Sequence, residues 1–136
     1  MITIDTSGLF AILNRDDPHH QRVRNEVVAD RGPWLIPAAT LGEVAYLIEH
    51  RLSPTVLNAF IEDLQESRFV LDCGDSDLAR VRALVQRYDD LPLGLVDAAV
   101  IACAERNGGR VLTLDVRHFG VVSRDSPIVL LPDPYV

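Results

Sequence analysis

The sequence predicts an α/β fold built on a parallel sheet. Short apolar runs of strand length, β-branched or leucine-rich, recur along the chain, and stretches of helical length separate them. This alternation is typical of a parallel sheet that is covered by helices on both faces. At 136 residues the chain is long enough for one hydrophobic core, so we expect a single domain over 1–136. The strand-like runs lie near residues 1–4, 34–36, 69–71, 111–114 and 128–131.

The first helical stretches carry recognisable start signals and apolar stripes. Residues 17–30 begin with Asp17-Pro18, which puts proline at the first helical position. Residues 39–51 carry apolar side chains at helical spacing along one stripe. Both patterns indicate helices that pack one face against the sheet.

The later helical stretches are bounded by capping and stop residues. Residues 53–66 open with a Ser-Pro pair and show helical spacing of their apolar positions, and Asp75 or Ser76 is expected to cap the next helix. Residues 96–106 are apolar almost all round, which predicts a buried helix. This helix is expected to stop at Asn107-Gly108-Gly109.

The composition is that of an ordinary globular protein of a reducing compartment. Hydrophobic residues make up 48% of the chain and charged residues 24%. No apolar stretch approaches the roughly 20 residues of a membrane span, and the N-terminal residues lack the basic and apolar regions of a signal peptide. Cys73 and Cys103 form no metal or redox motif, and Cys103 lies in an apolar run that predicts a buried thiol. We therefore expect a cytoplasmic protein without a membrane partner.

The charge balance limits the classes of function. A net charge of −7 argues against a protein that coats nucleic acid through bulk charge. It leaves open an enzyme that binds RNA locally through a metal and a few arginines, because metal ligands lose their net charge when the ion binds. All 13 basic side chains are arginine, which codon bias in a GC-rich genome explains simply. The absence of lysine excludes every catalytic scheme that depends on one.

Two of the strand-like runs end in an aspartate. The run MITI leads into Asp5, and the run VLTL leads into Asp115. In a parallel sheet both carboxylates would emerge at the carboxyl edge, where open α/β sheets bind ligands. Two anions repel there unless a cation or a shared proton separates them, so the pair predicts a metal site. The alternatives are a helix N-cap for Asp5 and, for Asp115, a turn residue paired with Arg117.

Two further acids lie near the start of predicted helices. Thr40 and Glu43 have the spacing of a capping box, but Glu43 shares a helix face with Leu47 and is expected near the buried side. Asp97 opens the apolar helix, and an ionised carboxylate facing the interior costs several kcal/mol unless it is paired or bound to metal. A simple N-cap is the alternative for Asp97.

The remaining polar residues suggest simpler roles. Asp89-Asp90 lies in a polar segment and indicates a solvated turn. The histidines are not spaced as zinc ligands. For His118, contact with a substrate and packing within a loop both stay open.

Four carboxylates without a cysteine or histidine ligand set favour a hard cation. Mg²⁺ and Mn²⁺ prefer such oxygen ligands. An ion of this kind lowers the pKa of a bound water and stabilises charge that develops on a phosphoryl oxygen. Hydrolysis of a phosphodiester is the reaction class that fits this set.

The motifs together resemble those of the PIN domain. The resemblance rests on MITIDTSGL at residues 1–9, the helix that carries Glu43, the helix that begins Asp97-Ala98-Ala99, and VLTLDVRHF at residues 111–119. It covers essentially the whole chain, in order. It is closest to the VapC-type ribonuclease toxins of bacterial type II toxin–antitoxin systems.

This resemblance implies a fold, an activity and partners. The fold would be a three-layer α/β/α domain with a mostly parallel central sheet of four to five strands. The activity would be that of an Mg²⁺-dependent endoribonuclease, with Mn²⁺ as a substitute, which inhibits translation by cleaving RNA. The partners would be a second copy of the chain, in a homodimer, and a cognate antitoxin whose C-terminal segment blocks the site.

The resemblance also implies roles for individual residues. The acidic quartet of the family, which is catalytic and holds the metal, falls on four positions: Asp5, Glu43, Asp97 and Asp115. The small hydroxyl position of the family falls on Thr6 and Ser7. We expect these two residues or Arg117 to orient the substrate or the metal ligands.

Other aspartate-based enzymes fit the sequence less well. A phosphatase of the haloacid dehalogenase type needs a second aspartate where Ser7 stands, and it needs a lysine. A receiver domain lacks the same lysine, and no glycine-rich phosphate loop is present. The alternative of another class is an inactive PIN-like domain that serves as an RNA-binding or scaffold module. RNA cleavage that depends on a divalent ion and is abolished by EDTA would distinguish the enzyme from the scaffold.

Overall fold

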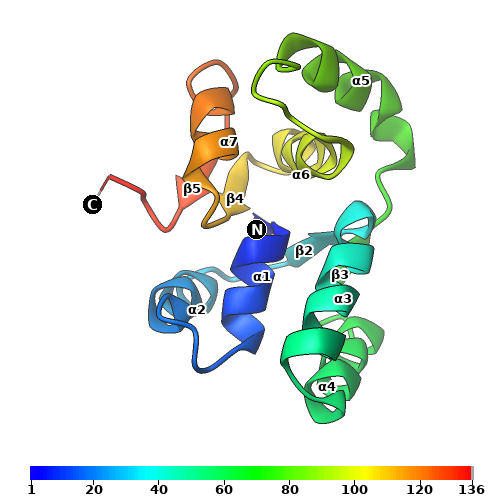
Figure 1. Ribbon diagram of the computed structural model, residues 1–136, viewed down its shortest axis with the longest axis vertical. Coiled ribbons are helices and arrows are strands. Elements are labelled where there is room, and N and C mark those ends of the chain that lie inside the picture. Colours follow the sequence, from blue (N-terminus) through cyan, green and yellow to red (C-terminus); the bar gives the residue numbers. More distant parts are fainter. Residues whose placement is uncertain (136) are drawn as a thin grey trace.

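A parallel sheet of five strands forms the centre of the part of the chain that the structure describes, residues 1–135 of a computed structural model (Figure 1). The strand order is β3-β2-β1-β4-β5, and each neighbouring pair is parallel. The strands are β1 (Ile2–Ile4), β2 (Trp34–Pro37), β3 (Val70–Asp72), β4 (Arg110–Leu112) and β5 (Val129–Leu131). The predicted parallel sheet is thus confirmed, and Val136 of the predicted domain lies outside the described residues.

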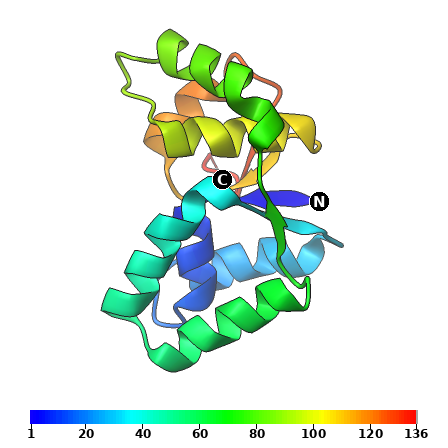
Figure 2. The same cartoon turned by 90° about the vertical axis from the view of Figure 1, so that its right-hand side faces the viewer.

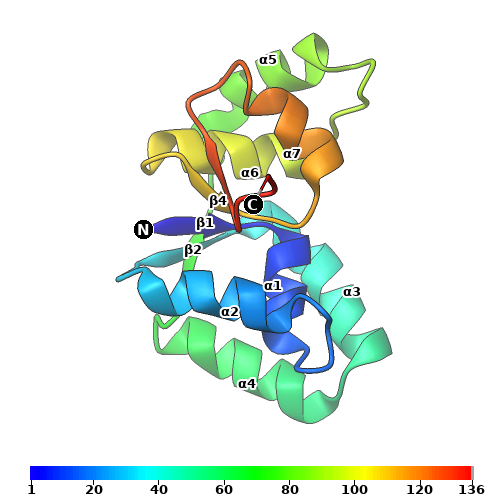
Figure 3. The same cartoon turned by 90° about the vertical axis from the view of Figure 1, so that its left-hand side faces the viewer.

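Helices cover both faces of this sheet. The helices α1 to α4 lie on one face and α5 to α7 on the other, as Figure 3 shows and as Figure 2 shows from the opposite side. Their bounds are α1 (Thr6–Leu13), α2 (His20–Ala29), α3 (Leu41–Arg51), α4 (Pro54–Gln65), α5 (Leu78–Arg87), α6 (Leu95–Arg106) and α7 (Val116–Val122). The predicted three-layer α/β/α architecture is therefore confirmed. Among residues 1–135, no helix combines the length and the apolar character that crossing a bilayer requires.

Each face of the sheet has its own hydrophobic core. Because side chains alternate along a strand, Ile2 and Ile4 of β1 face α1 to α4, while Thr3 points to the other layer and its hydroxyl lies 3.7 Å from the Cys103 thiol of α6. In β4, Val111 packs among α5, α6 and α7, and Leu112 joins the opposite core. Cys103 is buried as predicted.

The strand order places the two strands that precede aspartates side by side. The chain runs outward from β1 to β2 and β3, then returns to build β4 on the other side of β1 and β5 beyond it. In open parallel sheets this reversal creates a crevice at the carboxyl edge, between the strands where the order reverses. Asp5 follows β1 and Asp115 lies just beyond β4, so both belong to this crevice.

Two helices beside this crevice were not among the predicted helical stretches, although a helix N-cap was one alternative for Asp5. The stretch α1 is apolar at most positions, which hides the helical period, and α7 has only seven residues. The α2 helix also starts later than predicted, at His20, because the Asp17 carboxylate accepts the His19 N–H in a turn before it. Ser53 caps α4 as predicted, by accepting the Val56 N–H.

A glycine lets α1 lie close against the end of β4. A Cβ atom on Gly8 would lie 2.6 Å from the backbone oxygen of Leu112, well inside van der Waals contact. The absent side chain therefore allows the first turn of α1 to approach the backbone beyond β4. This approach brings Asp5 and Ser7 beside Thr113.

Candidate active site

Four carboxylates from distant parts of the sequence line one cavity of about 640 Å³ at the carboxyl edge of the sheet. Asp5 and Asp115 are the N-cap residues of α1 and α7. Glu43 and Asp97 lie in the first turns of α3 and α6. The structure thus brings together all four acids of the predicted quartet: Asp5, Glu43, Asp97 and Asp115.

The helix ends give this cavity its electrostatic character. All four acids stand at helix N-termini, where unpaired N–H groups and the helix dipole carry partial positive charge. This charge eases the cost of holding several carboxylates together, but it amounts to a fraction of a unit per helix. A small ion with two positive charges would neutralise the acids more completely.

Asp5 is the most deeply buried of the four acids, with 5% of its surface exposed. Burial raises the pKa of the Asp5 carboxyl above its usual value, although hydrogen bonds from Thr113 and Ser7 act in the opposite direction. The Thr113 hydroxyl lies 2.9 Å and the Ser7 hydroxyl 3.0 Å from the same oxygen, Oδ2. Among the described residues, no side chain donates to Oδ1, and the Thr6 backbone also hydrogen-bonds to this carboxyl.

Thr113 is a part of the site that sequence reasoning missed. Its hydroxyl donates to Asp5 and accepts the backbone N–H of Asp115 at 3.0 Å, so it links two acids of the cavity. The Ser7 hydroxyl makes a parallel link, since it donates to Asp5 and accepts the Leu114 N–H. The available signal was a lone hydroxyl in the apolar run VLTL, two residues before Asp115.

Asp97 lines the cavity and is half-buried, so it faces the site where we expected the protein interior. Burial is the largest cause that raises its pKa, to about 6, and the negative charges of Asp5 and Asp115 add to the effect. The nearby His118 acts in the opposite direction. The cavity therefore holds more negative charge than its own hydrogen bonds compensate.

Glu43 is exposed and is held by Thr6 across the gap between α1 and α3. The Thr6 hydroxyl donates to Glu43 Oε1 at 2.8 Å. The predicted capping box is wrong, because Thr40 ends a short 3-10 turn and donates its hydroxyl to the Pro37 carbonyl oxygen. The expectation that Glu43 lies near the buried side is also wrong, since its side chain points into the open cavity.

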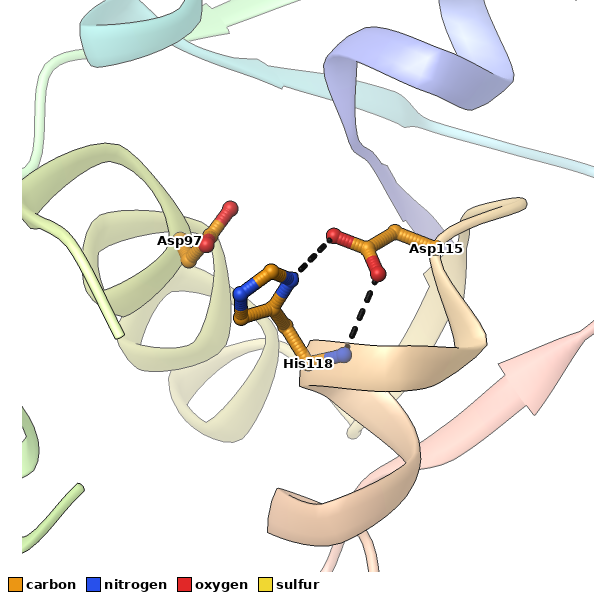
Figure 4. A group of neighbouring side chains, drawn as sticks. All are labelled: Asp97, Asp115 and His118. Atoms are coloured by element: carbon orange, nitrogen blue, oxygen red, sulfur yellow. Dashed lines mark hydrogen bonds and ion pairs between the residues drawn. The ribbon is translucent and has the colours of Figure 1, made fainter. Parts of the chain in front are cut away.

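Asp115 is paired with His118 and not with Arg117. One Asp115 oxygen accepts the His118 backbone N–H at 3.1 Å, and the other lies 2.9 Å from His118 Nδ1 (Figure 4). Arg117 is exposed in the first turn of α7. Potential ligand atoms of Asp97, Asp115 and His118 lie within 4.8 Å of one another.

The donor set of this cavity fits a hard divalent cation. Carboxylate oxygens dominate, and the hydroxyls of Thr6, Ser7 and Thr113 hold two of the four acids in place. Such oxygen-rich sets suit Mg²⁺ and Mn²⁺, whereas the two cysteines lie outside the cavity lining. The openness of Glu43 to solvent leaves room for a substrate beside the acids.

Comparisons with known proteins agree with this fold. Residues 2–124 match the family model described as PIN domain. Ribonuclease VapC26 of Mycobacterium tuberculosis is 29% identical over 121 residues, which cover 88% of this chain and 90% of that protein.

Two solved structures share the fold. That of VapC20 from Mycobacterium tuberculosis matches with a TM-score of 0.76 at 20% identity, over 89% of this chain and 95% of the other. That of FitAcB from Neisseria gonorrhoeae matches with a TM-score of 0.65 at 18% identity, over 96% of each chain.

Proposed function

The chain belongs to the PIN domain family, and we propose that it is an Mg²⁺-dependent endoribonuclease. The observation that carries the proposal is the convergence of Asp5, Glu43, Asp97 and Asp115 on one cavity at the carboxyl edge of the sheet. The 29% identity to a protein named Ribonuclease VapC26 supports RNA as the substrate.

We assign the metal first to Asp5 and Asp97. Asp5 presents Oδ1 and Asp97 presents a half-buried carboxylate at the same cavity, so both would bind Mg²⁺ directly. Glu43 and Asp115 would bind it directly or through water; both Asp115 oxygens already contact His118. When bound, Mg²⁺, or Mn²⁺ in its place, lowers the pKa of a water and stabilises negative charge on the phosphoryl oxygens.

The protein's own residues would position these reacting groups. Glu43 is the acid most open to solvent, and Thr6 holds its Oε1, so its carboxylate would orient an attacking water. Ser7 and Thr113 hold Asp5 in a single orientation. Arg117, at the exposed end of α7, would contact a phosphate of the bound RNA.

We further propose that the nuclease is the toxin of a toxin–antitoxin pair. The identity to VapC26 supports this, and VapC20, whose structure has the same fold, is described as a toxin that cleaves the sarcin–ricin loop. The protein would act in the cytoplasm as a homodimer and inhibit translation. A cognate antitoxin would block the acid cavity with its C-terminal segment.

RNA cleavage by the purified protein tests the enzymatic proposal. We expect cleavage of a mixed cellular RNA substrate with Mg²⁺, loss of cleavage with EDTA, and at least a hundredfold slower cleavage by Asp5→Asn and Asp97→Asn. Asp89→Asn, in the exposed turn before α6, serves as the matched control and should cleave normally. Unchanged metal-dependent cleavage by both site variants in folded protein would refute the assignment. Absence of any cleavage would favour the inactive scaffold.

Growth of cells that express the gene tests the proposed role as a toxin. Expression alone should arrest growth, and co-expression of the neighbouring gene should restore it. The Asp97→Asn variant should be harmless in both settings. Normal growth on expression of the active wild-type enzyme would count against the toxin while leaving the nuclease intact.

A further inference from the structure

An exposed aromatic ring stands at the rim of the acid cavity. Tyr46 of α3 lines the cavity, one helical turn after Glu43. Even so, 58% of the surface of Tyr46 is exposed. Exposed tyrosines without a partner are not unusual by themselves. The surroundings of this ring, however, fix its position.

His50 holds the Tyr46 ring in place. The two rings stack with centroids 4.0 Å apart and an interplanar angle of 26°. His50 Nδ1 lies 2.8 Å from the Tyr46 backbone oxygen, to which it donates, so the imidazole is itself oriented. With one face against His50 and more than half the side chain exposed, the Tyr46 ring offers its other face to solvent. A ring that is already ordered can stack on a ligand at a low entropic cost.

A second hollow with two arginines lies at the far end of the same pair of helices. The helices α1 and α3 lie side by side (Figure 1). Residues of their N-terminal turns line the acid cavity. The other hollow is lined by Arg15, which follows α1, and by Arg51, at the end of α3. Asp16 also lines it. The guanidinium of Arg51 lies 6.0 Å from the centre of the Phe10 ring of α1. At about 1.5 Å per residue, the eight residues of α1 separate the two hollows by about 12 Å.

We propose that the surface along α1 and α3 binds a single-stranded segment of the RNA, with Tyr46 stacked on a base next to the scissile phosphate and Arg51 and Arg15 on the backbone further along. This inference rests on the proposed ribonuclease function. An aromatic platform beside a cationic site matches the two recurring chemical groups of single-stranded nucleic acid, base and phosphate. Duplex RNA would not supply a free base face to Tyr46, so the surface favours unpaired RNA.

The charges of the second hollow agree with this direction of binding. Phosphates are repelled by the acid cavity except where a cation is bound, so affinity for RNA must come from groups outside it. Arg51 and Arg15 are exposed and outnumber the single acid, Asp16, in the second hollow. The strand would therefore be held at the arginines and at Tyr46 while its scissile phosphate lies at the carboxylates.

Fluorescence anisotropy with a labelled, unstructured RNA oligonucleotide tests the proposal. The measurement uses the Asp97→Asn background, in which the RNA stays intact. Tyr46→Leu should weaken binding at least about fivefold, whereas Tyr46→Phe, which keeps the ring, should stay within about twofold. Arg51→Gln should make the dependence of log affinity on log salt concentration shallower, by about 0.7 in the magnitude of its slope. Arg82→Gln, on α5 across the sheet, is the matched control and should change neither quantity.

Equal RNA affinity of Tyr46→Leu and Tyr46→Phe would overturn the proposal. A change in oligomeric state of Tyr46→Leu on analytical ultracentrifugation would also overturn it, because the ring would then belong to a protein interface.

The kinetics of RNA cleavage by Tyr46→Leu, with Asp97 intact, separate the proposed nuclease from the proposed RNA-binding surface. A raised KM with unchanged kcat supports the RNA surface. Wild-type protein that binds RNA but never cleaves it contradicts only the nuclease, and cleavage with an unchanged KM in Tyr46→Leu contradicts only the RNA surface.

Discussion

The raised pKa of Asp97 reflects the negative charge that is gathered in the acid cavity. Its carboxyl is only half-buried, but its pKa is raised to about 6 because burial and the charges of Asp5 and Asp115 oppose ionisation. At neutral pH the group is mostly ionised and therefore repels its neighbours. The fold tolerates this repulsion at a cost in stability that a bound cation would remove.

Replacing Asp97 by asparagine should stabilise the metal-free protein at neutral pH. The protonated carboxyl favours the folded state, because the folded pKa of about 6 exceeds the usual 3.8. That contribution is complete below pH 4 and is lost as the pH rises through about 6. In EDTA at pH 7.5, Asp97→Asn should raise the free energy of unfolding by about 1 kcal/mol after allowance for solvent screening.

Urea unfolding in EDTA at pH 5 and pH 7.5 measures this effect. The stabilisation by Asp97→Asn should be smaller at pH 5, where the wild-type carboxyl is mostly protonated. Asp89→Asn serves as the control for a general change in net charge. A variant that is less stable than wild type at pH 7.5 would show that the Asp97 carboxylate has a stabilising partner.

The Thr113 hydroxyl should matter more than other buried hydroxyls of the sheet. Thr113→Val keeps the shape but removes the donor to Asp5 and the acceptor for the Asp115 N–H. We expect a loss of about 1–3 kcal/mol in stability and a roughly tenfold weaker affinity for Mg²⁺. Urea unfolding and isothermal titration calorimetry measure the two quantities.

Thr3 supplies the matched control for this substitution. It is equally buried, but its hydroxyl has only the weak contact with the Cys103 thiol. Thr3→Val should therefore change stability by less than about 1 kcal/mol and leave Mg²⁺ affinity unchanged. Equal effects of the two substitutions would mean that the Thr113 contacts do not organise the site.

At the scale of elements, four helices point their N-termini at one place. Asp5 and Asp115 occupy the N-cap positions of α1 and α7, and Glu43 and Asp97 lie in the first turns of α3 and α6. Asp5 and Asp115 therefore combine two roles, since each occupies a helix N-cap position and also lines the cavity. For Asp5 the sequence left open a cap or a site residue, and the Asp5 side chain makes no capping hydrogen bond. For Asp115 it left open a turn residue or a site residue, and Asp115 lines the cavity while its Oδ1 accepts the His118 N–H.

The approach of α1 to β4 makes Gly8 intolerant of a larger residue. Alanine favours helices by about 1 kcal/mol over glycine, but its Cβ would lie 2.6 Å from the Leu112 backbone oxygen. Gly8→Ala should therefore destabilise the protein by about 2 kcal/mol and displace Ser7 from its partners. Thermal unfolding followed by circular dichroism measures the change.

Gly42 in the first turn of α3 provides the opposite case. No atom lies within 4 Å of a Cβ built there, so Gly42→Ala should raise stability by about 0.5–1 kcal/mol. If Gly8→Ala were instead as stable as Gly42→Ala, the close packing of α1 on the end of β4 would be excluded.

At the scale of the whole molecule, the sheet order and the acid cavity depend on each other. The reversal of strand order between β1 and β4 opens the crevice, and helices from both layers reach it, α1 and α3 from one face and α6 and α7 from the other. An ion in this cavity would therefore join the two layers. Its binding energy would add to the stability of the complete fold.

Mg²⁺ should accordingly protect the entire protein against heat. At a concentration a hundredfold above its dissociation constant, a ligand of the folded state adds about 2.7 kcal/mol, or roughly 10 °C in Tm for a chain of this size. EDTA should reverse the shift, and NaCl at equal ionic strength should not reproduce it. Differential scanning calorimetry of wild type and Asp5→Asn measures this, and an equal shift in the variant would exclude Asp5 as a ligand.

Much of the fold follows from local sequence patterns. The strands of the parallel sheet and the aspartates that follow them can be recognised from short runs of apolar residues. The later helices can be recognised from local start and stop residues such as Ser53 and Gly109. The α1 and α7 helices escaped prediction because one lacks a polar face and the other is very short. The capping box at Thr40 failed because tertiary contacts gave Glu43 a different partner, Thr6.

The sequence by itself determined the α/β class and pointed to Asp5, Asp97 and Asp115, because strand-ending aspartates and an acid on an apolar helix are visible in local order. Glu43 joined them through the resemblance to the PIN domain, since both local interpretations of this residue were wrong. Only the tertiary structure decided how these acids are held. Thr113 meets Asp5, Thr6 meets Glu43, and His118 takes the place expected of Arg117 beside Asp115. The physical reason is that such contacts depend on strand order and on the packing of α1 against α3 and β4. Distances across the sheet are set by the whole chain and by no single segment of it.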